Sequence, residues 1–182
     1  ILKYLERKKF KTFNFSISRK NLNDSSQNEL RKLSDEWFNV GEFNNEKIVN
    51  IIQEQKVDIL IDLVGFTNAS RLEIFNSRIA PIQISWLAYC NTTGLDTMDY
   101  LIADRNLIYD EEDNQYSEKI IKLPDIWNSH SGFEFDRNFS ELPSLSNNNF
   151  TFGSLNNFRK ISDETIDVWS EILEKTENSI LI

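Results

Sequence analysis

Short apolar runs alternate with longer, helically periodic segments along the chain. At residues 10–18 (FKTFNFSIS) aromatic and polar side chains alternate, which predicts a strand because successive strand side chains point to opposite faces. Residues 1–9 fit the end of a helix, and the polar residues 26–37 are expected to be helical. Another helix is predicted to begin at Asn44 or Asn45. Its apolar stripe has helical spacing: Ile48, Ile51 and Ile52.

The middle of the chain is the richest in predicted strands. Residues 59–64 are apolar at almost every position, as expected of a buried parallel strand between helices. Further strands are predicted at residues 82–87, 100–103 and 120–123. A short helix is predicted at residues 71–78, because its apolar side chains recur at helical spacing.

The last part of the chain follows a polar stretch, residues 128–149, which is the best candidate for a linker. Residues 150–155 then predict a strand, Ser162 is a strong helix N-cap, and residues 180–182 open another strand. The helix after Ser162 has its own apolar stripe: Ile166, Trp169, Ile172 and Leu173. Because strands and helices alternate throughout, the predicted fold class is α/β with mainly parallel strands.

Composition narrows the classes of function. The 182 residues carry a formal net charge of −9, and the 20 Lys and Arg residues form no extended block, so nucleic-acid binding through a basic surface is disfavoured. One Cys and one His leave no intrachain disulfide and no thiolate- or imidazole-based metal cluster. The single Cys and single His suit a protein of the reducing cytoplasm. We expect no membrane span, since no apolar run reaches about 18 residues. The first residue is Ile, and we expect an internal fragment of a longer protein.

Candidate functional residues follow from the position of loops after strands, where ligands bind in open α/β sheets. The loops in question are residues 65–71, 89–94 and 156–161. Lys160 stands just before a helix N-terminus and could reach a phosphate there, although an exposed loop lysine is the commoner case. For Arg71, on the first turn of its predicted helix, a surface or carboxylate-pairing role is likewise the commoner case.

Two other reactive side chains are weaker candidates. No His or other general base lies at a recognisable sequence spacing from Cys90, so Cys90 is not expected to be a nucleophile. His130 is expected to be an exposed loop residue. The chain contains no phosphate-binding GxxxxGK[ST] motif and no GxGxxG motif.

Four segments nevertheless resemble a known family. They are DILIDLVGFT, SRLEIFNSRIAPIQISWLAYCNTTGLDTMDYLIAD, YSEKIIKLP and FTFGSLNNFRKISDETIDVWSEILEKTENSILI. In order and spacing they are similar to the catalytic region of the O-linked N-acetylglucosaminyltransferases of glycosyltransferase family 41, including the plant SPINDLY-like and bacterial relatives. The motif APIQxxWLxY…TxG…MDY is the most specific part of the resemblance.

The resemblance implies a GT-B architecture, in which two Rossmann-like lobes bind a nucleotide-sugar. Residues 1–146 would form the N-terminal catalytic lobe, and residues 147–182 would begin the C-terminal lobe with its first β-α unit. It further implies an inverting transferase that uses a UDP-sugar, such as UDP-N-acetylglucosamine, and no metal or other cofactor. The acceptor would be a protein Ser or Thr, and tetratricopeptide repeats would precede this region.

Site residues follow from the resemblance position by position. Lys160 falls on the catalytic lysine that contacts the donor diphosphate. The other implied donor contacts are Asn157, Leu87 and Ala88. The implied acceptor and cleft residues are Arg71, Tyr89, Thr92, Thr93 and Gly94.

One loop departs from the family pattern. Where the family has LGYPGT, residues 87–92 read LAYCNT. The loop therefore lacks a proline, which fixes φ, and two glycines, which permit unusual backbone conformations and close approach. This change leaves two alternatives open: a transferase of the same fold with another acceptor, such as protein Asn or a glycan, and a non-catalytic binding module. The isolated 182-residue piece is expected to be inactive.

Overall fold

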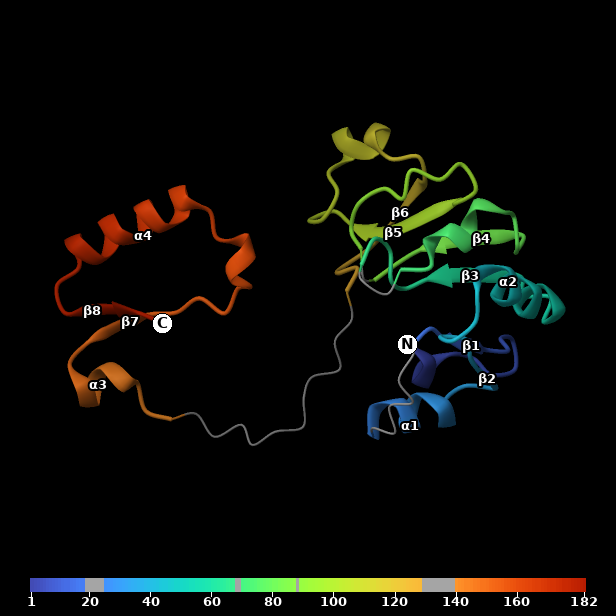
Figure 1. Ribbon diagram of the computed structural model, residues 1–182, viewed down its shortest axis with the longest axis horizontal. Coiled ribbons are helices and arrows are strands. Elements are labelled where there is room, and N and C mark those ends of the chain that lie inside the picture. Colours follow the sequence, from blue (N-terminus) through green and yellow to red (C-terminus); the bar gives the residue numbers. More distant parts are fainter. Residues whose placement is uncertain (19–24, 68–69, 88, 129–139) are drawn as a thin grey trace. The chain divides into compact units, whose positions relative to one another are not determined.

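The computed structural model describes residues 1–18, 25–67, 70–87, 89–128 and 140–182, and the chain divides into two compact units, Ile1–Ser131 and Gly132–Ile182 (Figure 1). The boundary predicted between residues 146 and 147 falls within the second of these units. The strands and α-helices of the first unit are β1 (Phe13–Ser16), α1 (Ser25–Lys32), β2 (Glu36–Asn39), α2 (Asn45–Glu54), β3 (Ile59–Asp62), β4 (Ile82–Ser85), β5 (Tyr100–Asp104) and β6 (Lys119–Leu123).

The first unit is built on parallel strands. Strands β3, β4, β5 and β6 are hydrogen-bonded in that order, and every neighbouring pair is parallel. Strands β1 and β2 form a separate parallel pair. The predicted strands near residues 13, 59, 82, 100 and 120 are therefore confirmed. Because all strands of the central sheet run the same way, the loops that follow them emerge at one edge.

Helix prediction was wrong where tertiary pairing outweighs local propensity. The segment 26–37 was expected to be one helix, but α1 ends at Lys32 and the chain continues as strand β2. The rings of Phe15 and Phe38 stack across β1 and β2 with centroids 5.1 Å apart, and this cross-strand pair stabilises β2 as a strand. Residues 1–9 and 71–78 were also expected to be helical. They contain the short 3₁₀ turns Leu2–Tyr4 and Leu72–Asn76 instead of α-helices.

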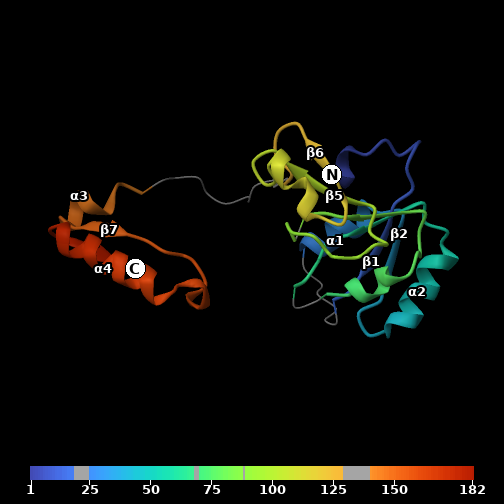
Figure 2. The same ribbon diagram turned by 90° about the horizontal axis from the view of Figure 1, so that it is seen from above.

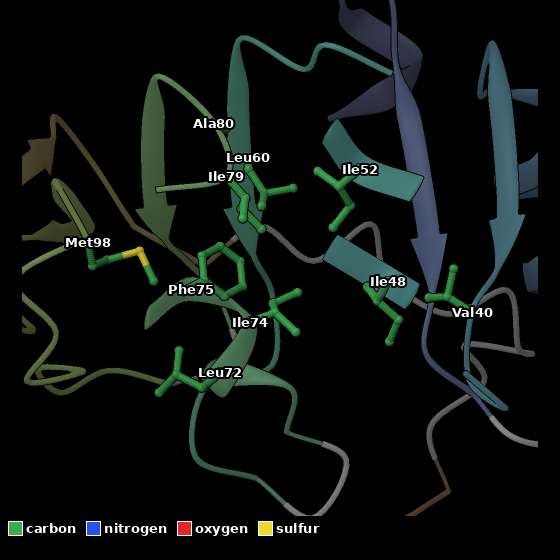
Figure 3. Packing of buried hydrophobic residues seen from close by; sticks show 10 residues of the cluster. All are labelled: Val40, Ile48, Ile52, Leu60, Leu72, Ile74, Phe75, Ile79, Ala80 and Met98. Carbon is green, nitrogen blue, oxygen red and sulfur yellow. The ribbon is translucent and has the colours of Figure 1, made fainter. Parts of the chain in front are cut away.

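The core lies on one face of the central sheet. Figure 3 shows ten of its residues, with Ile48 and Ile52 of α2 lying on one side of the cluster, opposite Leu60 of β3 and Phe75. Asn44 caps α2, as one of the two predicted capping residues, by accepting the N–H of Lys47 at 2.9 Å. Both isoleucines are 1% exposed, so the predicted apolar stripe of α2 is the helix face that packs on the core.

The opposite face of the sheet is apolar but exposed. Strand β3 buries only alternate residues, Leu60 and Asp62, whereas the sequence predicted a buried strand. The exposed side chains on β3, β4 and β6 are 36% to 45% accessible: Ile59, Ile61, Ile82 and Ile121. Three of the four residues of β3 are apolar, which explains why the sequence predicted burial on both faces, whereas the described residues of the first unit bury only one.

The second unit contains a β-α-β arrangement. Its elements are α3 (Pro143–Asn147), β7 (Phe150–Phe152), α4 (Asp163–Lys175) and β8 (Ser179–Leu181), and β7 pairs in parallel with β8. Helix α4 runs alongside β7 and β8 in Figure 1 and alongside β7 in Figure 2. Ser162 caps α4 as predicted, since its hydroxyl oxygen accepts the N–H of Thr165 at 3.3 Å. Helix α3 lies in the stretch that was predicted to be a linker.

Candidate functional site

A buried carboxylate shapes the turn at the carboxyl end of β3. Asp62 is 7% exposed and accepts the backbone N–H groups of Val64 at 3.1 Å and Gly65 at 2.8 Å. Burial raises the pKa of Asp62, because loss of hydration outweighs the two hydrogen bonds that favour the carboxylate. The turn leads directly into the loop that holds Phe66 and Arg71.

Gly65 allows that turn to approach the loop after β4. Its φ is +54°, a conformation that favours glycine, and a Cβ atom placed there would lie 2.1 Å from Cβ of Tyr89. The rings of Phe66 and Tyr89 then meet edge to face, with centroids 5.3 Å apart. Leu87, in the same β4 loop, has φ +81°, which is a strained backbone conformation for a non-glycine residue. The structure thus brings the predicted cleft residue Tyr89 against the β3 loop.

Arg71 borders a cavity of about 510 Å³. The cavity is lined by the start of α2, by the loop after β3 with the 3₁₀ turn that follows it, and by Leu95: Asn45, Phe66, Arg71, Glu73, Asn76 and Leu95 are among the lining residues. Because its walls follow the carboxyl ends of parallel strands, the cavity stands where ligands bind in open α/β sheets.

The Arg71 guanidinium is held by neutral oxygens. It donates to Oδ1 of Asn45 at 3.0 Å and to the backbone carbonyl of Gly41 at 3.2 Å. The Nδ2 group of Asn45 in turn donates to Oε2 of Glu73 at 2.8 Å. Arg71 was predicted from the sequence, but Asn45 was predicted only as part of a helix start. No sequence signal connects them, because they lie 26 residues apart.

Thr92 and Thr93 are held by a carboxylate that the sequence did not single out. Glu118 is 3% exposed and accepts the Thr93 N–H at 2.7 Å, the Thr93 hydroxyl, the Thr92 hydroxyl at 2.8 Å and the Ser117 hydroxyl at 3.2 Å. Glu118 directly precedes β6, at the amino end of the parallel sheet. The predicted acceptor loop is therefore divided between Tyr89, beside the β3 turn, and the threonines, which are tied to the start of β6. Gly94 follows them with φ +70°.

Asn157 and Lys160 lie in the second unit, in the loop after β7. Oδ1 of Asn157 accepts the N–H of Arg159 at 3.1 Å and so begins the 3₁₀ turn Phe158–Lys160. Lys160 is exposed and stands two residues before the N-cap of α4. A cavity of about 370 Å³ opens beside this loop, lined by Gly153 and Asn156 together with Trp169 of α4.

Some predictions lie beyond what the structure describes. Ala88 and His130 fall outside the described residues. Within the described ranges, no three His, Cys, Asp or Glu side chains gather closely enough to hold a metal ion. None of the helices described is both long and apolar enough to cross a membrane.

Comparison with known proteins places this arrangement in a class. The model of Glycosyl transferase family 41 matches residues 1–131, the same span as the first compact unit. The structure is similar to that of a mutant O-GlcNAc transferase of Thermobaculum terrenum, with a TM-score of 0.88 and 27% sequence identity over 99% of this chain and 34% of that one. The predicted α/β class with Rossmann-like parallel units is confirmed.

Curated relatives give the same family. The chain is 38% identical over 146 residues to the probable UDP-N-acetylglucosamine–peptide N-acetylglucosaminyltransferase SPINDLY of Eustoma exaltatum subsp. russellianum, and 35% identical to that of Arabidopsis thaliana. Each alignment covers 80% of this chain and 16% of the relative, so the chain spans about a sixth of their length. The chain belongs to glycosyltransferase family 41, as the sequence motifs predicted.

Proposed function

We propose that this chain is part of a protein glycosyltransferase that moves N-acetylglucosamine from UDP-N-acetylglucosamine to Ser or Thr hydroxyl groups, with inversion and without a metal ion. The observation that carries the proposal is the family match over residues 1–131. The names of the SPINDLY relatives support the donor and the peptide acceptor. The cavity beside Arg71 supports a ligand site at the carboxyl ends of β2 and β3.

The proposed reaction is a single displacement at the anomeric carbon. The acceptor hydroxyl oxygen forms a bond to C1 of the sugar while the bond from C1 to the β-phosphate oxygen breaks. UDP leaves with the electron pair, and the hydroxyl proton passes to a general base. Because attack occurs opposite to the leaving group, the configuration at C1 inverts. Negative charge grows on the diphosphate, so a cation close to it lowers the barrier.

Donor roles are proposed for residues of the loop after β7 and of the loop after β4. The ammonium of Lys160 stabilises the leaving diphosphate, and Asn157 supplies a polar contact close to it. Both lie before the N-terminus of α4, where backbone N–H groups favour an anion. Leu87 and Ala88 are proposed as further donor contacts on the family motif alone, since Ala88 lies outside the described residues.

Acceptor roles are proposed for the first unit. Arg71 and Tyr89 contact the acceptor directly, since Arg71 borders the cavity and Tyr89 packs on Phe66 at its rim. Thr92, Thr93 and Gly94 act by fixing the loop that carries Tyr89. Thr93 is buried and hydrogen-bonded, which suits a residue that holds backbone in place.

The test is sugar transfer by the full-length protein from radiolabelled UDP-N-acetylglucosamine to a Ser/Thr peptide. Lys160→Ala is expected to lower kcat by roughly a hundredfold or more, the scale for removal of one charge-stabilising group. Arg159→Ala, in the same 3₁₀ turn, is the matched control and should retain activity. The configuration of the product sugar, read by its C1 proton coupling, tests inversion, and turnover in excess EDTA tests metal independence.

A second candidate acceptor is favoured by the changed loop. Residues 87–92 read LAYCNT, and the described Cys90 and Asn91 are exposed, so the surface that the acceptor meets differs from the family pattern. Mass spectrometry of the glycosylated product distinguishes Ser or Thr from Asn or a glycan. Full-length protein that fails to bind UDP at millimolar concentration would instead be a non-catalytic module.

A further inference from the structure

Asn45 stands between two opposite charges at the cavity of the first unit. Its Oδ1 atom accepts from Arg71 at 3.0 Å, and its Nδ2 group donates to Glu73 at 2.8 Å. All three side chains line the same cavity of about 510 Å³. The amide is oriented by these two bonds, since an acceptor must face the guanidinium and a donor must face the carboxylate.

The amide links the two groups by hydrogen bonds but carries no charge. The ion pairs found among the described residues involve Arg7, Lys9, Lys11, Arg78, Lys122 and Lys175, and none involves Arg71. A guanidinium has five N–H donors in a planar fork. Two neutral acceptors, Asn45 and the Gly41 carbonyl, fix its orientation and leave its charge uncompensated.

We infer that Asn45 is a positioning residue that keeps Arg71 available as a cation, and that Arg71 binds an oxyanion in this cavity. A carboxylate or phosphate group fits the fork because it accepts two parallel N–H bonds. Glu73 opposes the anion, and its bond to Asn45 keeps its charge away from Arg71. The inference rests on the proposed function only in naming two sources of the oxyanion: an acidic side chain of the acceptor, or a phosphate of the donor.

The experiment measures binding to the full-length protein by isothermal titration, so it needs no turnover. One arm uses UDP, and the other compares a peptide that contains Ser and Glu with the same peptide carrying Gln in place of Glu. An acceptor carboxylate predicts that the Glu peptide binds more tightly than the Gln peptide. A donor phosphate predicts that the two peptides bind alike and that only UDP responds to the variants below.

Asn45→Asp places a carboxylate against Arg71. We expect it to lower the affinity for the probe that binds at Arg71 by roughly fivefold, the upper range for a partly exposed ion pair. Asn76→Asp is the matched control, because it adds the same charge to the same cavity but Asn76 is not a partner of Arg71. Its effect should be clearly smaller. Glu73→Gln removes the negative charge that repels the anion and should raise the affinity for the same probe.

Two results would overturn the inference. One is equal weakening by Asn45→Asp and Asn76→Asp, which would mean a diffuse effect of charge with no role for the bond to Arg71. The other is unchanged binding of both probes in Glu73→Gln, which remains measurable even if Asn45→Asp fails to fold. If the full-length protein transfers no sugar but shows these binding differences, the result would count against the proposed function. It would still support the oxyanion site at Arg71.

Discussion

The carboxylate of Asp104, the last residue of β5, accepts the backbone N–H of Trp127 at 2.7 Å, across 23 residues of sequence. The carbonyl of the same Trp127 residue accepts the indole N–H of Trp86 at 3.0 Å. Both polar groups of one backbone residue are thus bound by side chains that come from the carboxyl ends of β4 and β5. This pair of bonds fixes the path of the chain as it leaves β6.

The Asp104 bond predicts a pH dependence of stability. The N–H of Trp127, with those of Asn106 and Leu107, holds the pKa of Asp104 below its ordinary value of 3.8. A lowered pKa means that the carboxylate stabilises the fold above pH 3.8, and that this contribution is lost as pH falls through the folded-state pKa. Asp104→Asn should therefore lower the free energy of unfolding at pH 7 and flatten its decline in acid.

Urea unfolding at pH 7 and pH 3 tests this expectation, with Asp96→Asn as the control because Asp96 is exposed. Equal losses of stability for Asp104→Asn at both pH values would show that the carboxylate charge has no part in the effect.

Gly65→Ala is expected to disrupt the contact between the β3 and β4 loops. The new Cβ would overlap Cβ of Tyr89, and the positive φ adds strain of about 1 kcal/mol or more. Gly94→Ala separates the two causes, since Gly94 has φ +70° but no atom within 4 Å of the built Cβ. Thermal unfolding should show a clearly larger loss for Gly65→Ala. Equal losses would mean that the close approach of Tyr89 is not constraining.

Glu118→Gln tests the anchor of the threonine loop. A glutamine keeps only one oxygen, so its NH₂ group would face either the two donors of Thr93, at the position of Oε1, or the hydroxyls of Thr92 and Ser117, at the position of Oε2. Leaving buried donors unpaired costs about 1–3 kcal/mol each, so stability should fall by roughly that amount or more. Hydrogen exchange of Glu118→Ala, which removes both oxygens, provides the specific measurement: the Thr93 amide should lose protection. Retained protection at Thr93 in Glu118→Ala would contradict the assignment of Glu118 as the anchor.

The strands and helices that local pattern specifies were predictable, and the contacts between distant loops were not. Helix α2 carries an apolar period and strand β3 lies in a short, almost continuous apolar run, and each pattern marks its element whichever partner it meets. Trp37 lies in a polar segment with no such period, and its strand exists because β1 lies beside it.

The same reasoning applies to the site. Arg71 and Lys160 were proposed as site residues because loops after strands and the family motif mark their positions. Glu118 and Asn45 could not be found, because each acts on a residue about 26 positions away through the folded chain. Sequence pattern therefore points to candidate side chains in loops after strands more readily than to the distant side chains that hold those loops.

Asp62 should show a pH dependence opposite in sign to that of Asp104. Burial raises its pKa above 3.8, so its ionisation costs folding free energy as pH rises through the folded-state pKa, and the cost is absent below pH 3.8. Asp62→Asn removes the ionisation and can still accept the Gly65 N–H through its amide oxygen. The free energy of unfolding of Asp62→Asn relative to the unsubstituted chain should therefore increase from pH 4 to pH 7. Denaturant unfolding across this range measures the difference, and a difference that stays constant with pH would show that Asp62 carries no such cost.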